Sequence, residues 1–185
     1  VEAVRRGTVG FVNALGAGIL ETRALGAFLP AIARSRLGID LLLPNIATWW
    51  CGGAQARDYV RAHIDTMLVG PAFSTVLAID DAGSTEDAGS LSAPDQQALL
   101  ARIDADPKSF VAQEAVSLST APVHVGDVLE PRPVTLRVYA ARTTDGWTIM
   151  PGGLARVGSA RETTALAMQH GGQAGGRDRC LRAGG

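Results

Sequence analysis

Lysine is almost missing from this sequence. Of its 17 basic residues Lys108 is the only lysine and the others are arginines, and 18 acidic residues bring the net charge to −1. A protein that binds nucleic acid or an anionic membrane through its surface charge needs an exposed cationic field, which a balanced composition does not favour. We therefore expect neither nucleic acid nor a membrane among its partners.

Cysteines and long apolar runs are also scarce. The two cysteines, Cys51 and Cys180, lie far apart and have no paired spacing, so a zinc site or a disulfide framework has no support. We expect Cys51 to be a buried, small apolar residue. The longest apolar run, residues 9–20, is shorter than the roughly 20 residues of a membrane-spanning helix and contains glycines. Since no segment has the character of a signal peptide, a cytoplasmic location is expected.

Length and composition predict one domain or two small packed lobes. The chain has 185 residues, of which 46% are apolar, and can bury a real core. We expect a folded domain over residues 1–170 and a disordered, glycine-rich tail over residues 171–185. Because the sequence starts at Val1 and not at methionine, we also expect a fragment of a longer protein.

Hydrophobic periodicity predicts a mixed α/β chain. Helical spacing marks residues 21–36, interrupted at Pro30, then residues 54–63, and a helix that Ser92 caps and that ends before Asp106. The polar residues 80–90 indicate a solvated loop. Short apolar runs predict buried strands at residues 8–12 and 67–73, and a buried strand or an extended segment at residues 41–43.

The centre of the chain carries the clearest strand patterns. Residues 110–116 form an apolar run with a polar pair, Gln113 and Glu114, near its end. Residues 131–140 alternate, and we expect a buried face made of Val134, Leu136, Val138 and Ala140. The pair Asp145-Gly146 then predicts an antiparallel hairpin whose second arm runs from Trp147 through residues 151–157.

The same stretches carry a resemblance to a known family. The words "DLLLPNIATWWCG", "FVAQEAVSLSTAP" and "PRPVTLRVYAARTTDGWTIMPGGLARV", in this order, resemble the circularly permuted ATP-grasp family, the glutathionylspermidine synthase-like group of type 2. The resemblance implies a partial ATP-grasp domain of the α/β (α+β) class, with antiparallel sheets and flanking helices. It also implies ATP and Mg²⁺ as cofactors. The implied activity is that of an ATP-dependent carboxylate–amine ligase, which activates a carboxylate as an acyl phosphate and joins it to an amine, with a peptide or a small molecule of the polyamine type as substrate.

By this resemblance, residues 113–116 are the strand on the adenine side of the nucleotide. Backbone groups of Glu114 and Val116 would contact the base, Glu114 would reach the ribose or the amino group, and Gln113 would belong to the same site. The end of an edge-like strand presents backbone donors and acceptors that suit this role. The alternative is that Gln113 and Glu114 only solvate the end of a strand.

Three arginines are candidates for the phosphates. Arg137 stands on the non-apolar side of its predicted strand, where a guanidinium can hold phosphate oxygens and stabilise charge during phosphoryl transfer. Arg156 and Arg132 are candidates by the same reasoning. The alternative for Arg137 is a surface ion pair with Glu130 or Asp145.

Other positions depart from the family pattern. Gly70 stands where relatives would carry a basic residue, Gln169 and His170 where we would expect an arginine, and no acidic cluster occurs on the hairpin. We therefore expect the metal ligands to lie outside this chain. A second function stays open, a catalytically inactive ATP-grasp fold that serves as a binding module. A third, a dinucleotide site at Gly16 and Gly18, has only an incomplete fingerprint.

Overall fold

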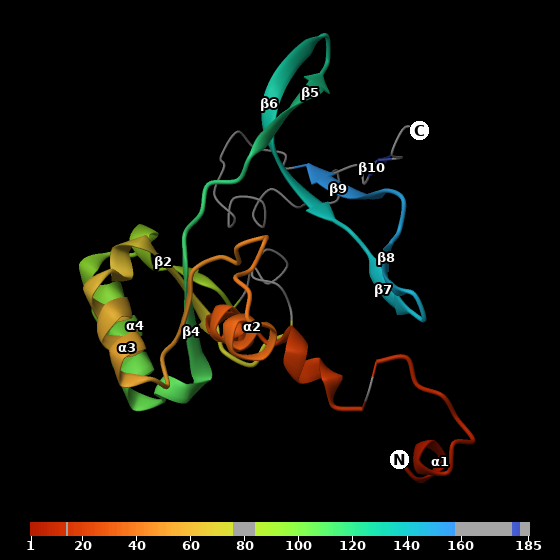
Figure 1. Ribbon diagram of the computed structural model, residues 1–185. Coiled ribbons are helices and arrows are strands. Elements are labelled where there is room, and N and C mark those ends of the chain that lie inside the picture. Colours follow the sequence, from red (N-terminus) through yellow and green to blue (C-terminus); the bar gives the residue numbers. More distant parts are fainter. Residues whose placement is uncertain (14, 76–83, 158–178, 182–185) are drawn as a thin grey trace. The chain divides into compact units, whose positions relative to one another are not determined.

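The computed structural model describes residues 1–13, 15–75, 84–157 and 179–181 (Figure 1). They belong to two compact units. The N-terminal unit holds the described residues of Val1–Leu77 and Gly83–Glu114, and the C-terminal unit holds those that follow Glu114. In both units the sheets are antiparallel, which confirms the mixed α/β class with antiparallel sheets.

The N-terminal unit contains a four-stranded sheet and most of the helices. The sheet has the order β1-β4-β2-β3, with β1 (Thr48–Trp50), β2 (Met67–Pro71), β3 (Glu86–Asp87) and β4 (Phe110–Glu114). The α-helices are α1 (Glu2–Arg5), α2 (Leu29–Leu37), α3 (Ala54–Ala62) and α4 (Ala93–Ala105). Short 3₁₀ helices are η1 (Ala17–Glu21), η2 (Arg23–Ala27), η3 (Ile64–Thr66), η5 (Ala88–Ser90) and η6 (Pro107–Ser109).

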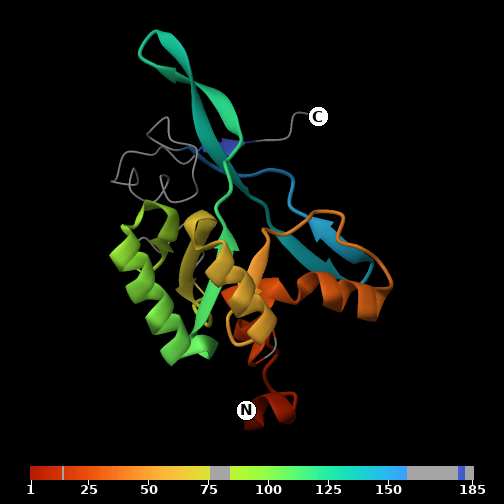
Figure 2. The ribbon, with the colours of Figure 1, turned by 90° about the vertical axis from the view of Figure 1, so that its left-hand side faces the viewer.

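Helices α3 and α4 cover one face of this sheet. They lie next to each other in Figures 1 and 2, on the same side of β2 and β4. Strand alternation sends every second side chain to this face, and the main core joins α3 and α4 to it through Val60, Leu99, Ile103, Met67, Val69 and Ala112, all buried.

The opposite face of the sheet is covered by η2. Ala24 of η2 packs with Val111 of β4 and with Ala72, and Trp50 adds to this smaller cluster. The two adjacent tryptophans therefore serve different faces: Trp49 stacks on Tyr59 of α3 at 4.7 Å, whereas Trp50 approaches Phe28 at 6.0 Å. Both rings are partly buried, and each packs against a different cluster.

The helix predictions of this unit are confirmed for α3 and α4. Helix α4 begins after Ser92, whose hydroxyl accepts a hydrogen bond from the Asp95 backbone N–H, and it ends at Asp106. The interruption predicted at Pro30 is also present, because η2 ends at Ala27 and α2 begins at Leu29. Pro30 lies in the first turn of α2, where proline needs no N–H partner.

The predicted buried strands at residues 8–12 and 41–43 do not form. Val12, Leu42 and Leu43 are almost fully exposed, and no ladder of the described sheets includes them. Apolar composition alone suggested these strands, but none of the described strands pairs with either segment. Without a strand before Gly16, the dinucleotide fingerprint loses its structural context. Within residues 80–90, the predicted loop is replaced at its described end by β3 and η5.

The C-terminal unit consists of strands. Its larger sheet has the order β10-β9-β6-β5, and a separate hairpin pairs β7 with β8. The strands are β5 (Thr120–Val125), β6 (Val128–Arg137), β7 (Ala140–Thr143), β8 (Gly146–Ile149), β9 (Gly153–Val157) and β10 (Arg179–Leu181). The long β6 changes partner after Pro133: its residues up to Pro133 pair with β5, and its residues from Val134 on pair with β9. The described residues of the segment 171–185 are those of β10.

The hairpin at Asp145-Gly146 is confirmed, with two differences. Its first arm is the short β7 and not the whole of residues 131–140, and β9 does not extend the second arm but pairs with β6. The predicted buried face is also wrong, since Leu136 is 67% exposed and Val138 64%. Alternation requires a covering layer to become burial, and no described helix belongs to this unit.

Candidate functional site

A buried arginine stands at the centre of the polar groups on the η2 face of the sheet. Arg23, the first residue of η2, is only 7% exposed. Its Nη1 donates a hydrogen bond to Thr85 Oγ1 at 2.9 Å, and its Nη2 donates to Gln113 Oε1 at 3.1 Å. Burial of a charge is costly unless hydrogen bonds compensate it, and these two bonds supply part of that compensation.

Gln113 passes the connection on to β1. Its Nε2 donates to Thr48 Oγ1 at 3.3 Å, so both ends of the amide are held. Gln113 is opposite Thr48 in the β1–β4 ladder and opposite Leu68 in the β2–β4 ladder, which places it in an inner strand. We call Arg23, Thr85, Gln113 and Thr48 the Arg23 network.

Gly70 makes room for this arginine. A Cβ atom at Gly70 would lie 2.2 Å from Arg23 Nη1 and 3.1 Å from Arg23 Cζ, far inside van der Waals contact. The guanidinium therefore lies against the backbone of β2 where a larger residue would collide with it. At the strand position where the resemblance expected a basic side chain, a cation is present, but it comes from η2.

Glu114 is the exposed last residue of β4. Its backbone N–H donates to the Ala47 carbonyl at 3.0 Å, and β4 lies between β1 and β2. The edge-like strand end expected from the sequence is therefore absent at this N–H. A contact of the Glu114 side chain with a nucleotide stays a prediction.

The other predicted site residues belong to the C-terminal unit. Val116 follows the end of β4, so residues 113–116 are not one strand. Arg137 is the exposed last residue of β6 and pairs with Leu154, and Arg156 of β9 pairs with Thr135 two positions away. Both arginine positions thus lie in one ladder.

One of the two acids named as an alternative partner of Arg137 pairs with another arginine, and a pair of Arg137 itself with Glu130 or Asp145 stays a prediction. Glu130 Oε2 lies 2.9 Å from Arg132 Nη2, and both side chains are largely buried, with exposures of 21% and 14%. Arg132 is thereby engaged within β6.

Cys51 is not a nucleophile in this arrangement. It is fully buried in the main core, as predicted, and burial raises the pKa of its thiol to about 11, although the Arg57 charge acts in the opposite direction. The neutral thiol therefore dominates at neutral pH, and only a thiolate attacks or binds metals well.

Neither a metal cluster nor a membrane span occurs in the described part of the chain. Within those ranges, no three His, Cys, Asp or Glu side chains gather to hold an ion, and no helix has the length and apolar character to cross a bilayer. Asp80, Asp81, Gln169 and His170 lie outside the described residues.

Arg23 was not predicted from the sequence. The α-helical spacing of apolar residues over positions 21–36 does not apply to residues 23–27, which form the 3₁₀ helix η2. The one signal that could have pointed to it was the unexpected glycine at position 70, which suggests that another side chain fills the space.

Comparison with known proteins gives a consistent family. A family model described as "Circularly permuted ATP-grasp type 2" matches residues 1–158. An uncharacterized protein of Synechocystis is 30% identical over 173 residues, which are 93% of this chain and 35% of that protein. An uncharacterized protein of Mycobacterium tuberculosis is 36% identical over 157 residues, 85% of this chain and 17% of its own length.

A third relative has a name that states a reaction. A protein of Frankia alni named "Putative glutamate--cysteine ligase 2-3" is 32% identical over 174 residues, 93% of this chain and 19% of that protein. The chain spans about a third or less of the length of each of these relatives.

Proposed function

The chain belongs to the circularly permuted ATP-grasp type 2 family, and from this premise we propose that it forms part of the nucleotide site of an ATP-dependent carboxylate–amine ligase. In such a reaction a carboxylate oxygen attacks the γ-phosphorus of ATP and ADP leaves. The amine then attacks the acyl phosphate, and phosphate leaves. The name of the Frankia relative, a ligase of glutamate and cysteine, supports this reaction class.

The observation that carries the proposal is the Arg23 network. A buried guanidinium lies against β2 and fixes the amide of Gln113 on β4, the strand assigned to the nucleotide. Phosphoryl transfer depends on positive charge and fixed dipoles near the phosphates, and such charges act strongly where water is excluded. Since Arg23 is itself almost fully buried, we give it a positioning role and an electrostatic one.

Arg137 is the residue that we propose to touch the phosphates. Its exposed side chain stands at the end of β6, in the same ladder as Arg156. A guanidinium offers five N–H donors in a planar fork that suits phosphate oxygens. We assign no magnesium ligand, and no step of the proposal passes through the metal.

Titration calorimetry of this chain with ATP tests the proposal. Arg137→Ala should weaken ATP binding by about 1.5–3 kcal/mol, the contribution of a hydrogen bond to a charged group. Arg61→Ala is the matched control, because Arg61 is an exposed arginine of α3 that pairs with Asp104 at 2.6 Å. No saturable binding, or an equal loss in both variants, would contradict the proposal and favour a binding module without catalysis.

A further inference from the structure

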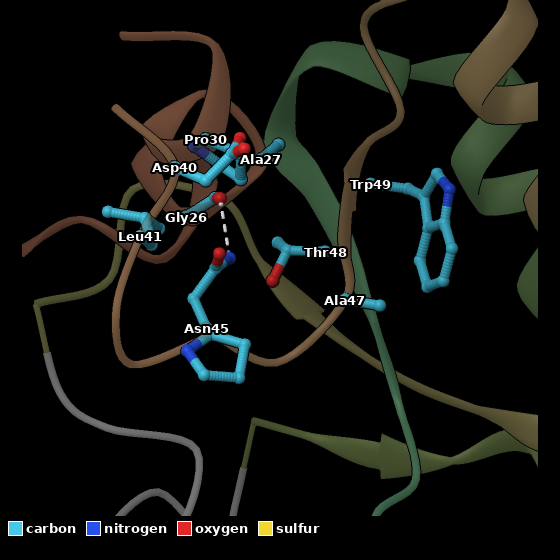
Figure 3. A pocket seen from close by; sticks show the side chains of 10 residues that line it. Gly26, Ala27, Pro30, Asp40, Leu41, Asn45, Ala47, Thr48 and Trp49 are labelled. Carbon is cyan, nitrogen blue, oxygen red and sulfur yellow. Dashed lines mark hydrogen bonds between the residues drawn. The ribbon is translucent and has the colours of Figure 1, made fainter. Parts of the chain in front are cut away.

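A hollow of about 450 Å³ lies within the N-terminal unit (Figure 3). It is lined by the loop of residues 38–47, which joins α2 to β1, and by residues of η2, α2 and β1. Ala27, Pro30 and Leu41 supply apolar lining. The volume falls within the range of small-molecule sites, which are mostly apolar with a few polar groups that fix orientation.

The polar groups of this hollow present acceptors. Asn45 uses both hydrogens of its Nδ2, one on the Gly26 carbonyl at 2.9 Å, drawn as a dashed line in Figure 3, and one on the Ile46 carbonyl at 3.0 Å. The Thr48 hydroxyl donates to the same Ile46 carbonyl at 2.7 Å. The Asn45 amide hydrogens and the Thr48 hydroxyl hydrogen therefore already have acceptors within the protein. The groups of the lining that can accept hydrogen bonds from a ligand are Asn45 Oδ1 and the Asp40 carboxylate.

The charge of the lining has one sign. Asp40 is its titratable residue, and none of the lining residues, all in the described part of the chain, is lysine, arginine or histidine. Arg34 approaches Asp40 from outside the lining, with Nε 3.4 Å from Oδ1, and the two side chains are 64% and 85% exposed. Such an exposed pair is weak, so a ligand cation can replace Arg34.

We infer that this hollow binds a primary aliphatic amine in its ammonium form. An ammonium group donates three hydrogen bonds and accepts none, which matches the Asp40 carboxylate and Asn45 Oδ1. A short alkyl chain matches Ala27, Pro30 and Leu41. An anion would meet neither a cation nor a side-chain donor here.

The hollow is also connected to the Arg23 network. Thr48 lines the hollow and accepts the hydrogen bond of Gln113, which in turn accepts from Arg23. The amine is therefore the acceptor of the ligation, an assignment that rests on the proposed function, whereas amine binding itself does not require ATP.

The test is an NMR titration of the whole isotopically labelled chain with n-butylamine at pH 7, without ATP. Saturable shifts at the amides of Leu41, Asn45 and Thr48 are expected. n-Butanol has the same alkyl chain but no charge, and tetramethylammonium has the charge but no N–H hydrogen-bond donors. Both compounds should therefore bind far more weakly than n-butylamine. Absence of saturable shifts, or equal affinity for either control compound, would overturn the inference.

Two charge variants should act in opposite directions. Asp40→Asn should raise the Kd for butylamine about two- to fivefold, and Arg34→Ala should lower it by a similar factor, which is the scale of an exposed ion pair. Asp104→Asn, which removes the exposed partner of Arg61 on α4, is the matched control and should leave the Kd unchanged. Ala27→Phe, which fills the hollow, should abolish binding. An unchanged Kd in Asp40→Asn would contradict the site.

The two proposals fail separately. If the chain binds the amine but not ATP, the amine site is supported and the proposed ligase function is contradicted. If the chain binds ATP but not the amine, the proposed nucleotide site is supported and the amine site is contradicted. If both bind, an amine Kd that ATP leaves unchanged would overturn the assignment as acceptor.

Discussion

The contact between Gly70 and Arg23 gives a quantitative prediction. In Gly70→Ala the new Cβ would lie 2.2 Å from Arg23 Nη1 and 3.1 Å from Thr85 Oγ1, so the guanidinium has to move. Movement breaks one or both of the hydrogen bonds at 2.9 and 3.1 Å, each worth about 1.5–3 kcal/mol because the donor is charged. We expect Gly70→Ala to lower the free energy of unfolding by about 2–3 kcal/mol.

The same substitution should cost little once the arginine is gone. In an Arg23→Ala background the collision with the guanidinium is absent, and alanine in a strand is favoured over glycine by roughly 0.5–1 kcal/mol. The double-mutant cycle should therefore show a coupling of about 2 kcal/mol or more between the two positions. Gly10→Ala, where a Cβ meets nothing within 4 Å, is the control and should show no coupling.

Urea unfolding followed by tryptophan fluorescence measures this cycle. Trp49 and Trp50 belong to the N-terminal unit, whereas Trp147 belongs to the C-terminal unit and is 70% exposed, so all variants should carry Trp147→Phe. The fluorescence then reports the unit that contains Gly70. A cost of Gly70→Ala that is the same with and without Arg23 would refute the reasoning.

Three further predictions concern other contacts. Because burial raises the pKa of Cys51 from 9.0 to about 11, the unfolded chain loses this proton first; stability should fall by about 1.4 kcal/mol per pH unit between these values, and urea unfolding of Cys51→Ala should lack this slope. Ser92→Ala removes the α4 cap and should cost about 1 kcal/mol by the same assay, and no loss would contradict the cap. In Gly153→Ala the Cβ would lie 2.8 Å from the Arg137 carbonyl, so hydrogen exchange should accelerate in the β6–β9 ladder; unchanged rates would speak against this close approach.

Local signals explain which elements were predictable. The Ser92 cap and the spacing of Leu99 and Ile103 determine α4 without help from distant residues, and the Asp145-Gly146 pair determines a two-strand turn. Residues 41–43 show the opposite case, because a short apolar run becomes a strand only when a partner strand exists. Leu136 and Val138 likewise alternate correctly but lack a covering layer in the described C-terminal unit.

The candidate site was only partly predictable from the sequence, because some of its contacts join residues that lie far apart in the chain. Gln113, Glu114, Arg137 and Arg156 followed from words that resemble a family, and the family is confirmed over residues 1–158. Their roles stay predictions. No spacing pattern links Arg23 to Gln113, since 90 positions separate them.

The features that follow from the amino-acid sequence alone are the family, helices α3 and α4, the turn between β7 and β8, and the burial of Cys51. Each of them depends on a local residue pattern or on sequence segments that resemble the family. The burial of Arg23 against Gly70, the inner position of β4, and the meeting of Asp40 with Asn45 at one hollow depend on the tertiary structure. Those features arise where strands and loops that are distant in the sequence come into contact. There, the burial of a side chain and its hydrogen-bond partners depend on the residues packed against it and not on its own local sequence.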